Sequence, residues 1–262
     1  MYKYLLLISF FCSQFICYSQ KLDTLIIESV FVKELRKINI WTPKDYLLNE
    51  EKYPVVYLLD GGIKEDFPHV QETIQKLIDE NKIPPVILVG IENTNRRRDF
   101  TGVTTSSKDK KLIPHYGGSE QFRLFLQEEL IYFIQKHYRA NNERTIMGES
   151  LAGLFIIETF FTHPEIFKNY IAYDPSLWWN KSFLVKESLN KISKLNYKGE
   201  KLWFAGSSTK DIQKNTRLLE QKLNNIPSSS FTWVYSDEPK EKHNTIFQAC
   251  KEKSLIWTLN NN

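Results

Sequence analysis

The sequence predicts an α/β protein, in which a mainly parallel central sheet carries helices on both faces and an antiparallel pair of strands opens the domain. Short, wholly apolar runs of strand length, such as VVYLL at 55–59 and VILVGI at 86–91, alternate with longer segments of helical periodicity. Strands that are apolar throughout are typical of parallel sheets covered on both faces. A chain of 262 residues suits a single domain of this class.

The first nineteen residues, MYKYLLLISFFCSQFICYS, are interpreted as a cleavable signal peptide. Lys3 supplies a basic start, residues 4–15 are apolar, and Cys17-Tyr18-Ser19 is a small-x-small cleavage pattern. The apolar run is too short for a membrane span, and no later stretch is long enough, so stable membrane insertion is not expected. The mature protein is therefore predicted to be secreted or periplasmic, with residues 20–262 forming one domain.

Cysteine usage and charge exclude several classes of function. Of the three cysteines, two lie in the predicted signal peptide, so Cys250 is expected to be a buried thiol without a disulfide partner. The net charge of +4 is small and spread along the chain, which does not favour nucleic-acid binding. The chain contains no H-E-x-x-H, no Cys/His cluster and no P-loop, so neither a metal nor another cofactor is expected. No feature indicates an oligomeric state.

The predicted elements follow the order of an α/β-hydrolase. An antiparallel pair is expected at 22–33 and 37–41, and further strands at 55–59, 86–91, 145–148, 170–173, 201–205 and 231–235. Helices are expected at 67–81, 119–138, 151–162, 210–224 and 244–259, with a polar loop at 92–116. Ligands bind at the carboxyl ends of parallel strands, and these ends meet at one edge of the sheet. The order therefore predicts that one edge carries Asp60-Gly61-Gly62, the segment from Ile91 onward, Ser150, Asp174, Gly206 and His243.

The segment TIMGESLAGLF at 145–155 has the pattern of a nucleophile elbow, a tight strand–turn–helix that exposes a serine. Such a turn needs small residues two positions before and after the serine, and here these are Gly148 and Ala152. Taken alone, the segment fits two interpretations equally well: Ser150 is either a nucleophile or simply the N-cap of the following helix.

A serine nucleophile needs an adjacent general base, oriented by an acid. Among five histidines, only His243 follows the last predicted strand, which is where the base falls in the hydrolase order Ser, acid, His. For the acid we expect Asp211, which follows the strand at 201–205; Asp237, Glu238 and Asp174 are rival candidates. The oxyanion is expected to bind the backbone N–H groups of Leu151 and Gly62.

Several segments, in this order, resemble the putative esterase family of α/β-hydrolases: PVVYLLDGG, NTNRRRDF, GGSEQFRLFLQEELIYFIQKHYR, RTIMGESLAGLF, HPEIFKNYIAYDPSLWW and the late His243. That family includes enterochelin-type siderophore esterases, esterase D-like enzymes and mycobacterial mycolyltransferases, and the resemblance spans residues 25–258. It implies an α/β-hydrolase fold with Ser150 as nucleophile and His243 as base. The backbones of Gly62 and Leu151 would then be the oxyanion donors.

The chain departs from the family at three points. The family usually has G-H-S-L-G-G where this chain has GESLAG at 148–153, so Glu149 and Ala152 are unusual. Asp174 stands where the family often has serine. The acid varies within the family, and some siderophore esterases use a Ser/His dyad, so Asp211 is the least constrained member of the predicted set.

Three further residues are expected at the same edge. Trp178 and Trp179 would form an aromatic wall for an acyl or aryl group, or else pack in the core. Arg98, with Arg96 and Arg97 of the RRRD run, would pair with an anionic substrate, or else lie on a solvated loop with one internal Arg–Asp pair.

The sequence therefore predicts a secreted serine hydrolase that cleaves a small-molecule carboxylic ester through an acyl-enzyme. Siderophore lactones or carbohydrate-linked acyl esters are the substrates that the resemblance indicates. The second hypothesis is a non-catalytic ligand-binding protein on a hydrolase scaffold.

Overall fold

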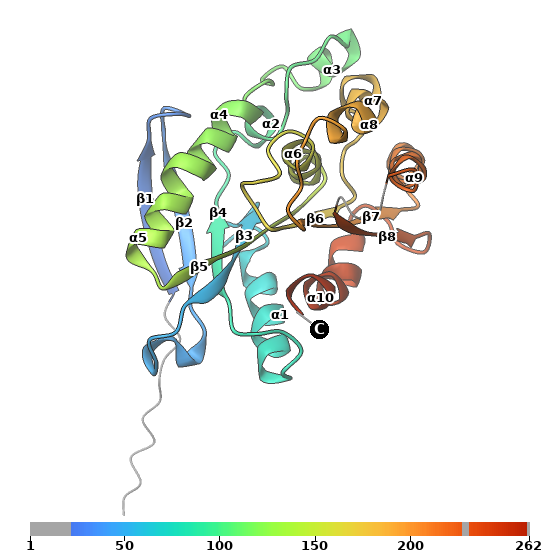
Figure 1. The fold of residues 1–262 in the computed structure, drawn as a ribbon. Helices are drawn as coiled ribbons and strands as arrows, with labels where there is room; N and C mark the ends of the chain where they lie inside the picture. Colours follow the sequence, from blue (N-terminus) through green and yellow to red (C-terminus); the bar gives the residue numbers. More distant parts are fainter. Residues whose placement is uncertain (1–21, 227–230, 261–262) are drawn as a thin grey trace, which may run out of the picture.

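A computed structural model describes residues 22–226 and 231–260 (Figure 1). Within these residues the strands form one sheet of eight strands in the order β1-β2-β4-β3-β5-β6-β7-β8. The strands from β3 onward run parallel, and β1 and β2 form the antiparallel N-terminal pair. The predicted fold class is confirmed. The predicted signal peptide, with Cys12 and Cys17, lies outside the described residues.

The strands lie close to the predicted ranges. Their bounds are β1 Leu22–Ser29, β2 Glu34–Trp41, β3 Tyr53–Leu59, β4 Ile87–Ile91, β5 Ala140–Glu149, β6 Asn169–Tyr173, β7 Lys201–Ser207 and β8 Thr232–Glu238. All five residues of β4 and of β6 are buried, as expected of parallel strands covered on both faces. Their apolar side chains must therefore contact helices above and below the sheet.

Helices cover both faces of the sheet (Figure 1). One face carries α1 (Phe67–Asp79) and α10 (Ile246–Leu259). The other carries α6 (Leu151–Phe160), α9 (Lys210–Leu223) and the continuous helical segment formed by α4 (Ser119–Leu124), η2 (Phe125–Ile131) and α5 (Tyr132–His137). Short helices complete the chain: η1 Lys44–Leu47, α2 Arg96–Asp99, α3 Ser107–Leu112, α7 Trp179–Lys186 and α8 Ser188–Ile192.

Strand β7 shows how the two layers are made. Leu202 and Phe204 belong to the same buried cluster as the α9 side chains, whereas Trp203 and Ala205 belong to the cluster that contains α10. Successive side chains of a strand point to opposite faces, so a strand between two helical layers must be apolar at every position. Cys250 of α10 lies fully buried in the second cluster, and burial raises the pKa of its thiol to about 12.

The structure differs from the expected elements in two places. The segment predicted as a polar loop at 92–116 contains the short helices α2 and α3. The predicted helix at 119–138 forms, but its middle third, η2, is wound as a π-helix. Neither difference moves the carboxyl edge of the sheet, where the candidate site lies.

Candidate active site

Ser150 lies on a strained turn between β5 and α6. Its backbone has φ 63° and ψ −115°, in a region that residues other than glycine rarely adopt, as expected of a nucleophile elbow. Although Ser150 occupies the N-cap position of α6, its side chain makes no capping hydrogen bond. The hydroxyl can therefore form a hydrogen bond with a side chain outside the helix.

That partner is His243. The Ser150 Oγ lies 3.1 Å from Nε2 of His243, and Nδ1 of His243 lies 2.9 Å from Oδ2 of Asp174. These two hydrogen bonds form a Ser-His-Asp relay of the kind that activates a hydroxyl for acyl transfer. The structure thus brings together Ser150 and His243, as predicted, across 93 positions of sequence.

The prediction that Asp211 is the acid is wrong. It lies exposed in the first turn of α9, and the carboxylate that contacts His243 is Asp174. The two remaining candidates form ion pairs away from His243, because Asp237 pairs with Arg217 and Glu238 pairs with Lys253. Among the residues that the structure describes, Asp174 is the carboxylate paired with His243.

Asp174 is held firmly at the end of β6. It has no exposed side-chain surface and a left-handed backbone with φ 43°. Its carboxylate also accepts hydrogen bonds from the Ser207 backbone N–H and the Ser207 hydroxyl, both at 2.6 Å, while its own N–H donates to the carbonyl of Ala205. Sequence reasoning did not identify Ser207, which follows the apolar run of β7.

The loop after β6 also binds the elbow directly. The Ser150 N–H donates to the carbonyl of Tyr173, and the Ser176 N–H donates to the carbonyl of Ser150, each at 2.9 Å. The Ser176 hydroxyl lies 3.3 Å from the Ser150 hydroxyl. The DPS sequence at 174–176 therefore fixes both the acid and the serine.

Electrostatics at the relay favour a cationic imidazole. The hydrogen bond to Asp174 raises the pKa of His243, partly offset by burial. Burial raises the pKa of the neighbouring Glu149 carboxyl to about 7, and the two groups interact, since each charge stabilises the other. Glu149 Oε1 is buried without a hydrogen-bond partner within the described part of the chain.

The two predicted oxyanion donors differ in their surroundings. Leu151 is the first residue of α6, where backbone N–H groups have no partner within the helix and the helix dipole favours negative charge. The Gly62 N–H, by contrast, donates to Oε2 of Glu65 at 2.7 Å. Gly62 can serve an oxyanion only after the Glu65 carboxylate releases it.

Arg96 links the loop after β3 to the elbow, a role that its place in the RRRD run does not reveal. Its guanidinium donates to both carboxylate oxygens of Asp60, at 2.6 and 2.9 Å, and to the carbonyl of Glu149 at 3.1 Å. Asp60, with a left-handed φ of 56°, precedes the Gly61-Gly62 pair. Arg96 thereby fixes the distance between the two segments that carry Gly62 and Ser150.

Arg98, predicted as a substrate contact, forms its hydrogen bonds within the fold. Its guanidinium donates to Glu34 and to Asp99, so its donors are used within the fold. Of the two roles expected for Arg98, the internal pair with an aspartate is the one that forms. Trp178 is half-buried, and Trp179 is buried with its indole N–H donating to the carbonyl of Gly102 at 3.1 Å. Trp179 also lines a cavity beside α6, so it fits both predicted roles.

The described residues offer neither a metal site nor a membrane span. No group of His, Cys, Asp and Glu side chains in residues 22–226 and 231–260 is placed to hold a metal ion. Over the same residues, no helix is long and apolar enough to cross a bilayer.

A family model described as "Putative esterase" matches residues 29–249. The chain belongs to this esterase family. It is therefore an ester hydrolase, and its mostly parallel sheet is the α/β-hydrolase sheet of that family. The hypothesis of a non-catalytic binding protein finds no support in these matches.

Individual relatives are consistent with this family assignment. The chain is 29% identical to the ferri-bacillibactin esterase BesA of Bacillus subtilis, covering 79% of each protein. The crystal structure of an IroE-like serine hydrolase from Shewanella oneidensis is 27% identical and has a TM-score of 0.84, covering 90% of this chain and 79% of that one. The siderophore hydrolase EstA from Aspergillus nidulans, at 18% identity and a TM-score of 0.73, shows the same fold over 90% of this chain and 93% of its own.

Proposed function

We propose that this esterase is a serine hydrolase that cleaves siderophore-type carboxylic esters through an acyl-enzyme. The observation that carries the proposal is the relay from Ser150 through His243 to Asp174. His243 takes the hydroxyl proton at Nε2 as Ser150 Oγ attacks the ester carbonyl, and Asp174 stabilises the imidazolium that results. The substrate class is supported by the names of the relatives, among them the ferri-bacillibactin esterase.

The tetrahedral intermediate carries a negative charge that must be met by N–H donors. The free N–H of Leu151 at the start of α6 supplies one, and the Gly62 N–H supplies another once Glu65 moves aside. Return of the proton from His243 to the leaving alcohol gives an acyl-Ser150. A water, deprotonated by His243, then releases the carboxylic acid.

A fluorophosphonate probe tests the nucleophile, because it labels only an activated serine. We expect the wild type to be labelled, and the Ser150→Ala and His243→Ala variants to remain unlabelled while keeping wild-type circular dichroism spectra. An unlabelled, folded wild type would overturn the proposal. A comparison of a catechol trilactone with simple acyl esters then tests the substrate class: we expect a clearly higher kcat/KM for the trilactone.

We also propose that the protein is exported by the signal peptide at 1–19, which places it outside the cytoplasm. Support comes from the basic, apolar and small-residue pattern of that segment. N-terminal sequencing of protein recovered from the periplasm or medium tests this. An N-terminus at Gln20 is expected, and recovery of chains that begin at Met1 would contradict it.

A further inference from the structure

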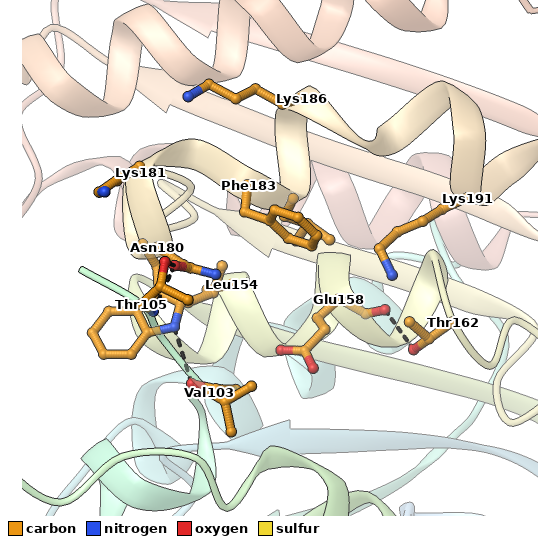
Figure 2. Close-up of a pocket in the computed structure, with 13 residues that line it drawn as sticks. Val103, Thr105, Leu154, Glu158, Thr162, Asn180, Lys181, Phe183, Lys186 and Lys191 are labelled. Carbon is orange, nitrogen blue, oxygen red and sulfur yellow. Dashed lines mark hydrogen bonds between the residues drawn. The ribbon is translucent and has the colours of Figure 1, made fainter. Parts of the chain in front are cut away.

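A cavity of about 500 Å³ lies beside α6, and Leu154 and Glu158 of that helix are part of its lining. Residues of α6, α7 and α8 and of the loop that follows α2 line this cavity, which is partly open to solvent (Figure 2). Its apolar lining includes Val103, Leu154, Trp179 and Phe183. Cavities of this volume with a mainly apolar lining are typical of small-molecule sites.

The wall formed by α7 is fixed by specific bonds. The Asn180 side-chain oxygen accepts from the Thr105 N–H at 3.0 Å, and the Asn180 N–H donates to the buried Asp109 carboxylate at 2.7 Å. Residues Asn180, Lys181 and Ser182 are all left-handed, with φ of 49°, 57° and 59°. Each such residue costs about 1–2 kcal/mol, and retained strain of this kind is concentrated at ligand clamps and active sites. These bonds hold α7 in position as one wall of the cavity.

The polar part of the lining is cationic. Lys181, Lys186 and Lys191 all border the cavity, and across the described residues no carboxylate lies within ion-pair distance of their ammonium groups. The carboxylate in the lining, Glu158, is already paired with the buried Arg123 at 3.2 Å. In Figure 2 the Lys191 side chain reaches from α8 toward Glu158 and Thr162. The lining thus carries three lysines against one carboxylate, and that carboxylate already pairs with Arg123.

Neither Ser150 nor His243 lines the cavity, and Leu154 of α6 connects it to the serine. Leu154 lies one helical turn beyond Ser150, and its N–H donates to the Ser150 carbonyl at 2.9 Å. One turn of α-helix rises only about 5.4 Å. A ligand that fills the cavity therefore extends away from the reacting hydroxyl along α6, toward Glu158 and Thr162.

We propose that this cavity is the acyl subsite of the enzyme, and that it selects acyl groups with an apolar body and an anionic group at the end remote from the scissile ester. The apolar body would lie on Leu154 and Phe183, and the anionic group would pair with Lys191. The inference rests on the proposed function, since it concerns the substrate that acylates Ser150.

Binding without turnover is tested in a Ser150→Ala background. The probes are 8-anilinonaphthalene-1-sulfonate and its uncharged analogue N-phenyl-1-naphthylamine, which differ in the sulfonate. Adding Lys191→Gln should weaken binding of the sulfonate about fivefold, the size of one partly exposed ion pair, and leave the neutral probe unchanged. Adding Phe183→Ser should weaken both, because both probes lose an apolar contact. Lys194→Gln, an exposed position three residues beyond Lys191, is the matched control and should change neither.

Hydrolysis tests the link to the serine. The substrates are p-nitrophenyl octanoate and mono-p-nitrophenyl suberate, whose acyl chains are equally long but differ in a terminal carboxylate. We expect the wild type to prefer the suberate, and Lys191→Gln to lower kcat/KM for the suberate about fivefold without changing the octanoate.

The two proposals fail in different ways. Equal kcat/KM for both esters in wild type and Lys191→Gln, or an equal effect of Lys194→Gln, overturns the acyl subsite while leaving the serine mechanism intact. Hydrolysis that survives Ser150→Ala overturns the serine mechanism. Loss of sulfonate selectivity in Lys191→Gln shows that Lys191 binds an anion in the cavity, and the ester comparison then decides whether the acyl group occupies it.

Discussion

Asp174 is bonded to three donors at once, because Ser207 supplies its N–H and hydroxyl and His243 supplies its ring N–H. This arrangement fixes the orientation of the carboxylate and aims one oxygen at the imidazole. An asparagine would fill the same space, but it cannot stabilise the imidazolium and it favours the wrong tautomer of His243.

The Asp174→Asn variant is therefore expected to lose about 10³–10⁴-fold in kcat, as in other serine hydrolases whose acid is replaced by its amide. Steady-state kinetics on a p-nitrophenyl ester measure it. Asp211→Asn is the control, because Asp211 lies exposed on α9, and its turnover should stay at the wild-type level. A loss in Asp211→Asn equal to that in Asp174→Asn would contradict the assignment.

Glu149 acts on the same imidazole through charge. His243 must be neutral to accept the Ser150 proton, so activity falls as pH drops through the pKa of His243. The negative charge of Glu149 raises that pKa. The positive charge of Arg96 lowers the pKa of His243, whereas Asp174 raises it, as Glu149 does.

The Glu149→Gln variant removes this charge, so the pKa of His243 falls and the acid limb of the kcat/KM profile moves to lower pH. The pH dependence of kcat/KM for a p-nitrophenyl ester measures the shift. A limb that stays in place or moves to higher pH would show that Glu149 does not act on His243 in this way.

Much of the relay could be predicted from chain order, and the reasons are local. Gly148 and Ala152 flank a serine between an apolar strand and an apolar helix, and His243 is the histidine that precedes the last helix. The sequence could not show which candidate carboxylate is the acid. That choice depends on the left-handed turn at Asp174 and on Ser207 from the neighbouring strand. Those contacts join strands that are far apart in sequence.

The elbow between β5 and α6 depends on close packing of its small residues. A Cβ added at Gly148 would lie 2.7 Å from the Ala152 Cβ and 3.2 Å from the Leu59 Cβ. Ala152 is therefore compatible with the turn because Gly148 leaves room for it. This explains why the family's second glycine is dispensable here.

The Gly148→Ala variant is expected to lose about 1–3 kcal/mol of stability, because two Cβ atoms are forced together. Adding Ala152→Gly should restore part of the loss, since it removes the closer contact and leaves that with Leu59. Urea denaturation of the single and double variants measures both effects. Equal stability of the two variants would show that the clash lies elsewhere.

Sequence patterns predicted the strands and long helices better than the segments around the cavity. The apolar runs of β3, β4 and β7 specify buried strands by themselves. The left-handed turn at 180–182 has no such signature, because it contains no glycine and is held by Thr105 and by Asp109 of α3. Tertiary contacts override local preference there.

At the scale of the whole molecule, parallel strand order explains why the site forms at all. Ser150 follows β5, Asp174 follows β6 and Ser207 ends β7, and these three strands are neighbours in the sheet. Their carboxyl ends therefore lie side by side, and His243 joins them from the segment that follows β8. The folded sheet provides the geometry that no single segment contains.

The strained backbone of Ser150 lowers the stability of the protein, although the nucleophile needs this conformation. With φ 63° and ψ −115°, a residue with a side chain is strained at that position by about 1–3 kcal/mol, whereas glycine is not. Ser150→Gly is thus expected to be more stable than Ser150→Ala by about 1 kcal/mol in thermal unfolding, since both lack the hydroxyl and differ in this strain. Equal melting temperatures would contradict this expectation. Selection for activity has kept this strained conformation, which selection for stability alone would remove. The large buried sheet provides the stability that offsets the strain.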